Sequence, residues 1–520
     1  MFQQIFALKA LLHQRYQLLK GEHTMLNRRH LLASSAASLL PALWPSLGHA
    51  QARKNQLTLA MALEPPVLDP TASAASAIGE VVLYNLFETL TKITPEGIAQ
   101  PLLAQRWQAS TDLKTYRFHL RQDVQFHNGV AFDADTVRFS LERAAGADST
   151  NKDKATWAQL RVQVIDRFTV DLHSPQPQPD LPFLLGQATA IMVEPSSAAT
   201  NAQQPVGTGP YRVQQWRKGS SITLLAWPGY REAGRIRIQR ATFRFIPDAA
   251  AQVAALLAGD VDVFPRVSAR SVAQFQGNAR FQVVVAGSRA KTIVAMNNAK
   301  APLNDVRVRR AIAAAIDRQA LITGAADGFG VPIGSHYVPG APGYIDTTAM
   351  NAYDPARARA LLAEAGVQTP LQLTMTLPPT PYARQGGEIV AAQLAQVGIQ
   401  VKLVNVEWAQ WLSGTYGQKQ YDLSLISHVE PLDLGNYAKP DYYWGYQSPA
   451  FQALYAQLQS TSDPEARLQL LAQAQRMLAE DCVNVFLYQP QWVTIANAQL
   501  RGLWAQMPLP VNDLSTLYWQ

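Results

Sequence analysis

Alternating apolar and polar residues predict short strands in the first part of the chain. From Tyr116 to Leu120, apolar residues alternate with Arg and His, the period of two that places one set of side chains on a core face and the other in water. The same alternation recurs from Leu57 to Met61. We therefore expect a strand in each of these segments.

A turn and a capped helix are predicted directly after the strand at 116–120. His127-Asn128-Gly129 has turn chemistry, and Asp133 is an N-cap residue followed by apolar residues at helical spacing. A second helix is expected farther upstream, from Ile78 to Leu90. This part of the chain thus mixes short strands, turns and helices.

The second half of the chain alternates predicted strands with predicted helices. Asp305, Asp354 and Asp463 are N-cap residues, and the last two precede a proline at the first helical position. The expected strands lie at 292–297, 371–375, 399–403 and 483–488, with helices after each of these Asp residues and from Glu388 to Val397. This order predicts a parallel sheet covered by helices, and such sheets bind ligands in the crevice beyond their strand ends.

The N-terminal segment has the pattern of an export signal. Arg28-Arg29 precedes an uncharged run at 31–47, and small residues near Ala50 and Ala52 suit signal peptidase. We expect residues 1–52 to comprise an upstream extension, with Met25 as an alternative start, and a cleaved signal peptide. The paired arginines suggest the twin-arginine route, and the Sec route stays open. A lipid anchor would be attached to a cysteine near the cleavage site, and none is present there. A free periplasmic protein is therefore expected.

The net charge of the full chain overstates that of the mature protein. The formal charge is +7, but removal of residues 1–52 leaves 40 basic against 37 acidic residues, a net charge of +3. This near balance argues against nucleic acid as a partner. Cys482 is the single cysteine, so an intramolecular disulfide is excluded, and 468 mature residues suggest roughly three compact units.

Several segments together resemble one family of transport proteins. They are PLLAQRWQASTDLKTYRFHLRQDVQFHNGVAFDADTVRFSLERA (101–144), VGTGPYRVQQW (206–216), MNNAKAPLNDVRVRRAIAAAIDRQALI (296–322) and YDPARARALLAEAGV (353–367). This wording resembles the family 5 extracellular solute-binding proteins, which are receptors for peptides, nickel chelates, opines and related solutes and feed ABC importers. The resemblance covers nearly all of residues 56–505.

The resemblance implies a fold and a domain organisation. The fold class is α/β: a two-lobed periplasmic binding protein of type II, with an extra subdomain in the first lobe and mixed sheets flanked by helices. Lobe I would comprise residues 53–296 and 489–520, with the inserted subdomain at about 91–205. Lobe II would comprise residues 297–488.

The resemblance also suggests a solute site in the loop after residue 427. Glu430 matches the acidic residue that grips the ligand's α-amino group in peptide receptors, and Asp433 matches the acid of a following Asp-Pro pair. A carboxylate in a poorly solvated cleft attracts a cation strongly. The alternative is that Glu430 is a solvated loop acid. His428 is either a hydrogen-bonding partner of the solute or an ordinary loop residue.

Aromatic and basic residues extend this candidate site. Tyr443, Trp444 and Trp408 can wall a pocket or belong to the core. Dipeptide receptors hold the peptide carboxylate with an arginine before a Pro-Tyr pair, but Thr380 stands there before Pro381-Tyr382. Arg384 either substitutes for that arginine or is a solvated charge. The candidate ligand-binding residues are Glu430, His428, Asp433, Tyr382, Arg384, Trp408, Tyr443 and Trp444.

A search for catalytic motifs favours a binding protein. The chain has no GxSxG, HExxH or dinucleotide-binding fingerprint, and its two SxxK patterns lack accompanying motifs. We expect no enzyme activity, no cofactor, no metal site and no nucleic-acid partner. The predicted function is that of a monomeric periplasmic receptor that delivers a small amine-bearing solute to ABC permease subunits. The alternative is a periplasmic hydrolase of peptide or amide conjugates.

Overall fold

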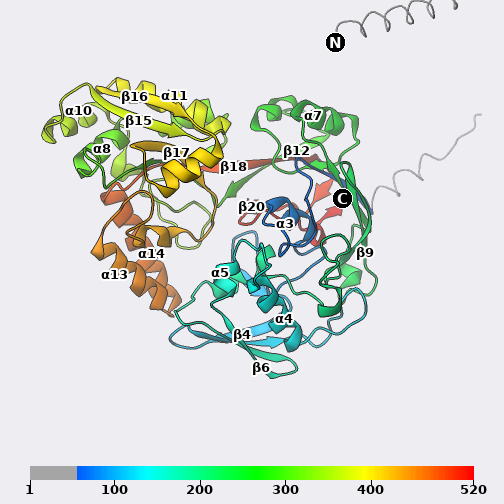
Figure 1. Ribbon diagram of the computed structural model, residues 1–520. Coiled ribbons are helices and arrows are strands. Elements are labelled where there is room, and N and C mark those ends of the chain that lie inside the picture. The colour runs from blue at the N-terminus through cyan, green and yellow to red at the C-terminus, as the bar shows by residue number, and fades with distance from the viewer. Residues whose placement is uncertain (1–54) are drawn as a thin grey trace, which may run out of the picture. The chain divides into compact units, whose positions relative to one another are not determined.

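The computed structural model describes residues 55–520 (Figure 1). Its largest sheet has thirteen strands, which come from both halves of the chain. In sheet order its main strands are β16 (Ile399–Asn405), β15 (Leu371–Leu377), β17 (Leu423–His428), β13 (Lys291–Met296), β18 (Val485–Asn497), β11 (Val263–Phe264), β1 (Gln56–Met61), β10 (Arg240–Phe245), β9 (Ser221–Ala226) and β8 (Tyr211–Arg217). Three further strands join off this path: β12 (Phe281–Ser288), β14 (Gly330–Pro332) and β20 (Gln506–Met507).

Strand β18 belongs to both parts of this sheet. Its first residues pair antiparallel with β13, as in Val294 opposite Val485. Its last residues pair antiparallel with β12, from Gly287 opposite Gln491 to Phe281 opposite Asn497. The 13-residue strand therefore runs continuously from the β13–β17 side to the β1–β12 side (Figure 1).

Helices cover the part of the sheet around β15, β16 and β17. They are α8 (Val306–Ala314), α9 (Arg318–Ala325), α10 (Pro355–Glu364) and α11 (Pro381–Ala395), and α13 (Pro449–Ser460) and α14 (Pro464–Glu480) pack on each other. Asp305, Asp354 and Asp463 each accept a backbone hydrogen bond at a helix N-terminus, so the three predicted caps are confirmed.

A second, four-stranded sheet lies in the segment between β3 and β8. Its order is β4 (Ala104–Ala109), β5 (Thr115–Leu120), β7 (Thr169–His173) and β6 (Arg161–Asp166), and α4 (Ala134–Ala145) packs on it. Tyr116, Phe118 and Leu120 are buried, and Asp133 caps α4 through the Thr136 amide. The strand and helix predicted in this segment are confirmed.

Short elements complete the described chain. They are α3 (Ser76–Val82), β2 (Thr91–Ile93), β3 (Ala99–Pro101), α5 (Lys154–Trp157), α6 (Leu181–Leu184), α7 (Ala249–Ala258), α12 (Trp408–Gln410), β19 (Leu500–Arg501) and β21 (Tyr518–Trp519). No helix among residues 55–520 has the length and apolar character needed to span a membrane. The predicted signal peptide, including Arg28-Arg29 and the start at Met25, lies outside the described residues.

Four expectations from the sequence were wrong in detail. The helix expected at 78–90 ends at Val82, since Tyr84 adopts a left-handed φ of 61° and cannot continue it. The helix expected at 388–397 begins earlier, at Pro381, and the strand expected at 483–488 extends to Asn497. The sheet is mixed: β15 pairs parallel with β16 and β17, but β13 pairs antiparallel with β17 and β18. The boundaries predicted for the lobes and the subdomain stay predictions.

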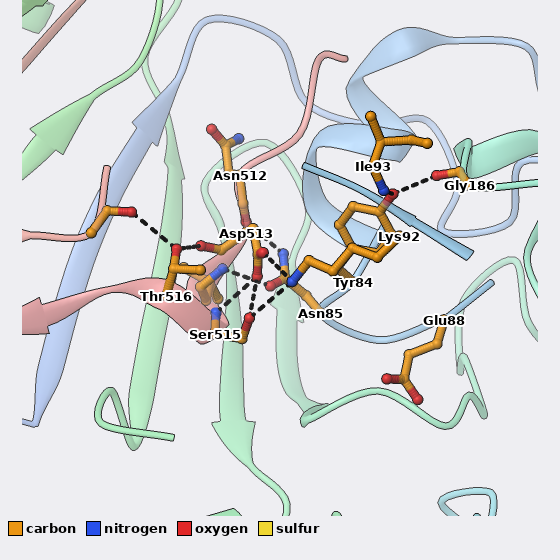
Figure 2. A network of polar contacts seen from close by, with 12 residues as sticks. Tyr84, Asn85, Glu88, Lys92, Ile93, Gly186, Asn512, Asp513, Ser515 and Thr516 are labelled. Carbon is orange, nitrogen blue, oxygen red and sulfur yellow. Dashed lines mark hydrogen bonds and ion pairs between the residues drawn. The ribbon is translucent and has the colours of Figure 1, made fainter. Parts of the chain in front are cut away.

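A buried polar network fastens the C-terminal segment to the segment after α3 (Figure 2). The Lys92 ammonium lies 2.5 Å from the Asp513 carboxylate, whose side chain is fully buried, and 5.0 Å from the centre of the Tyr84 ring. Asn85 donates to the Asn512 carbonyl and accepts from the Leu514 amide. Residues more than 400 positions apart in the chain are thereby held together.

Replacing Lys92 tests how much this network stabilises the fold. In Lys92→Met the Asp513 carboxylate stays buried without its cation, so we expect the free energy of unfolding to fall by about 3–5 kcal/mol. Urea unfolding followed by tryptophan fluorescence measures it. The exposed Lys402 provides the matched control, Lys402→Met, with little change expected. Adding Asp513→Leu to Lys92→Met should recover part of the loss, because it removes the unpaired carboxylate. Equal stability of Lys92→Met and the control Lys402→Met would contradict the prediction.

Candidate functional site

A buried carboxylate organises the loop that follows β17. One oxygen of Asp433 lies 2.5 Å from the Lys291 ammonium, and the other lies 2.9 Å from Nε2 of His336. Nδ1 of His428 is 3.6 Å from the same carboxylate. All four side chains are at least nine-tenths buried, so these contacts are shielded from water.

Hydroxyl groups fix both imidazole rings. Since Nε2 of His336 donates to Asp433, its Nδ1 accepts from the Tyr437 hydroxyl at 3.0 Å. Tyr437 in turn accepts from the Asn484 amide at 2.9 Å. Nε2 of His428 lies 3.0 Å from the Tyr443 hydroxyl. The buried polar groups thus form one connected network rather than isolated pairs.

Burial and charge determine the ionisation of this network. Burial by itself would raise the pKa of Asp433, but His336 and Lys291 outweigh it and hold that pKa well below its usual range. Burial lowers the pKa of His428 to about 3, with further lowering by His336 and Lys291. Burial likewise lowers the pKa of His336. At neutral pH, Asp433 is therefore ionised and both histidines are neutral.

The same three residues form a possible metal-ligand set. His336, His428 and Asp433 offer ligand atoms that all lie within 4.8 Å of one another. However, Lys291 already neutralises Asp433 at 2.5 Å, and its ammonium would repel a divalent cation bound there. The arrangement therefore favours a buried charge network over a metal site.

Lys291 also holds the backbone next to the predicted amine-binding residue. Its ammonium donates to the Glu430 carbonyl oxygen at 2.5 Å. The Glu430 side chain is exposed, and its carboxylate makes no hydrogen bond or ion pair with any of residues 55–520. The loop thus has a fixed backbone and an acidic side chain available to a solute.

The structure places the other predicted site residues at different depths. Tyr443 and Trp444 are buried, with exposed fractions of 1% and 0%, whereas Trp408 is 43% exposed. The Tyr382 hydroxyl accepts a hydrogen bond from the Ser427 amide at 3.1 Å, next to the loop. Arg384 is exposed and lies 3.6 Å from Glu407. No contact in the structure tests a role of these residues in binding.

A cavity of about 310 Å³ opens beside this loop. Pro431, Leu432 and Leu434 of the loop line one side. The remaining wall comes from the β2–β3 turn, the segment around α6, the β12–β13 connection, the loop at 337–342, α13 and α14. A volume of this size matches the lower end of small-molecule pockets.

Sequence reasoning missed the partners of Asp433. Lys291 ends one of the two SxxK patterns, Ser288-Arg289-Ala290-Lys291, and no motif marks His336 or Asn484. The available signal was Lys291 itself: it begins the strand KTIVAM, of which every residue is buried. A lysine in such a strand requires an acidic partner, but the sequence cannot say which acid among many supplies it.

Comparison with known proteins identifies the chain's relatives. The model of the family described as "Bacterial extracellular solute-binding proteins, family 5 Middle" matches residues 99–448, more than half of the chain. The dipeptide-binding protein of Escherichia coli is 28% identical over 455 residues, which is 78% of this chain and 83% of that protein. The glutathione-binding protein GsiB of Salmonella paratyphi A is 26% identical over 459 residues, 84% of this chain and 89% of that protein.

Solved structures support the same fold. HbpA2 of Haemophilus parasuis superposes with a TM-score of 0.81 at 22% identity, covering 90% of this chain and all of that one. The periplasmic murein tripeptide-binding protein MppA in its unliganded open form superposes with a TM-score of 0.79 at 21% identity, covering 90% of this chain and 97% of that one. The chain has the two-lobed α/β fold of periplasmic binding proteins.

The buried histidines make stability depend on pH. The unfolded chain protonates His428 near pH 6.5, whereas the folded protein keeps it neutral down to about pH 3, so the unfolded state binds more protons in between. We expect the free energy of unfolding to fall as pH falls from about 6.5 to 4, with His428 contributing about 1.4 kcal/mol per pH unit. Asp433 adds its own loss only below about pH 4.

Urea unfolding at pH 7.5, 6.5, 5.5 and 4.5 measures this dependence. His428→Gln should show a shallower decrease, with the remainder due to His336 and to His127, whose pKa burial lowers to about 4. The difference between the two proteins at pH 7.5, where His428 is neutral in both states, measures the change in packing and in the hydrogen bond to Tyr443. Identical slopes in the variant and the unsubstituted protein would contradict the assignment to His428.

Proposed function

Because the chain belongs to family 5 of the bacterial extracellular solute-binding proteins, we propose that it is the periplasmic receptor of an ABC import system. It captures a small amine-bearing solute, such as a peptide, modified peptide, opine or amino-acid conjugate, between its two lobes and delivers it to the permease. Binding energy drives closure of the lobes around the solute. The protein acts as a monomer and performs no chemistry on its cargo.

The available carboxylate of Glu430 is the observation that carries the amine specificity. It is exposed beside a pocket, has no partner among the described residues, and its backbone is held by Lys291 at 2.5 Å. A carboxylate on a loop whose backbone is already held pairs with an ammonium group at little cost in loop ordering. When closure excludes water, the attraction becomes stronger because it is less screened.

We divide the other candidate residues into those that hold the loop in place and those that can contact the solute. Asp433, His428, Tyr443 and Trp444 are buried, so we assign them to hold the loop from behind. Tyr382, Arg384 and Trp408 are partly or largely exposed and are free to approach a solute from the side. This division refines the prediction that all of them contact the cargo directly.

The names of the relatives support the class of cargo. Three of the compared proteins are named for a dipeptide, glutathione and a murein tripeptide. Dipeptides and glutathione carry a free α-amino group that a carboxylate can bind. The family is one of binding proteins, and nothing in the comparisons supports the alternative hydrolase.

Glu430→Gln tests the amine-binding role. Dipeptides, tripeptides and glutathione are screened for an increase in the melting temperature of the unsubstituted protein, and we expect N-acetylated forms of active peptides to give no increase. Glu430→Gln should lose the increase and keep its own melting temperature without peptide, because an amide attracts an ammonium group far less. The exposed Glu142 provides the control, Glu142→Gln, which should respond normally.

An unchanged response of Glu430→Gln, or equal responses to free and acetylated peptides, would refute this role. Mass spectrometry of the same mixtures after incubation tests the hydrolase alternative, since a receptor returns its peptides intact. Conversion of any peptide at catalytic amounts of protein would refute the receptor assignment.

A further inference from the structure

A buried arginine without an acidic partner forms part of the wall of the 310 Å³ pocket. Arg289 lies in the short connection between β12 and β13, and only 8% of it is exposed. Its Nη2 donates to the Glu96 carbonyl at 2.9 Å, but its Nη1 is buried and makes no hydrogen bond. No carboxylate among residues 55–520 forms an ion pair with it.

This position is costly for a cation unless something pairs with it. Burial lowers the pKa of Arg289, which reflects the unfavourable desolvation of its charge. An unpaired buried charge is rare in proteins, because its lost hydration is normally replaced by an opposite charge and hydrogen bonds. Gly97 packs so closely on the guanidinium that a Cβ at that position would overlap it, so the arginine is held in place.

The remaining charges of the pocket already compensate each other. Three charged residues line it, and two of them, Asp180 and Arg467, form an ion pair at 2.8 Å. Arg289 is therefore the uncompensated charge of the lining. The rest of the wall is largely apolar, with Phe183, Leu434, Leu458, Leu468 and Leu471 among its residues.

We propose that this pocket binds the carboxylate of a solute with an apolar body, and that Arg289 is the residue that pairs with it. A guanidinium binds a carboxylate through two parallel N–H donors, and Nη1 has no hydrogen-bond partner among the described residues. The apolar wall receives the body of the solute. Pro431 and Leu432, which follow Glu430 in the chain, line the same pocket as Arg289. The acid proposed to bind the amine is therefore next in sequence to the pocket that holds the arginine proposed to bind the carboxylate.

This inference rests on the proposed receptor function and specifies its cargo. The solute carries both an ammonium group and a carboxylate, separated by an apolar segment. A peptide with an apolar C-terminal residue has this chemistry, as does an amino-acid conjugate with an apolar substituent. A purely cationic amine does not satisfy Arg289 and is expected to bind more weakly.

A small monocarboxylate tests Arg289 without involving the amine site. Binding of 3-phenylpropanoate and of the neutral 3-phenylpropanamide to the full-length protein is measured by ligand-observed NMR titration. We expect the carboxylate to bind about tenfold or more tightly than the amide, since a hydrogen bond to a charged group is lost in the amide. In Arg289→Gln the two should bind equally weakly. Arg310→Gln, at an exposed arginine of α8, should discriminate like the unsubstituted protein.

The outcomes separate this inference from the proposed function. Failure of the unsubstituted protein to bind the carboxylate, or equal binding of acid and amide, overturns the assignment whatever peptides do. Retained discrimination in Arg289→Gln overturns it as well. If Arg289→Gln does not unfold cooperatively, Arg289→Lys takes its place and should discriminate less, because it keeps the charge but loses the two-donor geometry. Glu430→Gln should keep the preference for the carboxylate, so a failed amine site leaves this result intact.

Discussion

The hydrogen bonding of one strand, β18, is the constraint on which the rest of the structure depends. Its early residues pair with β13 and its late residues with β12, so one continuous backbone belongs to both parts of the large sheet. Strands β12 and β13, joined by residues 289–290 (the crossing), both pair antiparallel with β18 and form a second connection beside it. Closure of the two lobes, as proposed here, would have to be absorbed by a few residues of these connections.

The chemistry of the candidate site follows from where that crossing lies. Arg289 and Lys291 are two residues apart at the crossing, and both are buried cations. Lys291 has a protein partner in Asp433, whereas Arg289 has none among the described residues. The segment that joins β12 to β13 thus places two buried positive charges beside the candidate site.

Local features of the fold could be predicted from the sequence, and long-range ones could not. Asp133, Asp354 and Asp463 reveal helix starts because a cap acts within three residues, and residues 116–120 reveal a strand because its period is local. The pairing of Lys291 with Asp433 spans 142 positions. The residues around each of them in the sequence give no indication of its partner. The candidate site, too, depends on long-range contacts that local sequence patterns do not predict. Glu430 was found by resemblance, but the burial of Tyr443 and Trp444 depends on packing that no local pattern records.

The network in Figure 2 joins residues early in the chain to the C-terminal segment. Asp513 pairs with Lys92, and the Trp519 indole donates to the carbonyl of Gln56 in the first strand. These partners are separated by nearly the whole described sequence, so the β1 region makes these contacts only when the C-terminal segment packs against it. Contacts of such long range slow folding. The fold of the described residues is therefore completed only when the first strand and the C-terminal segment come together.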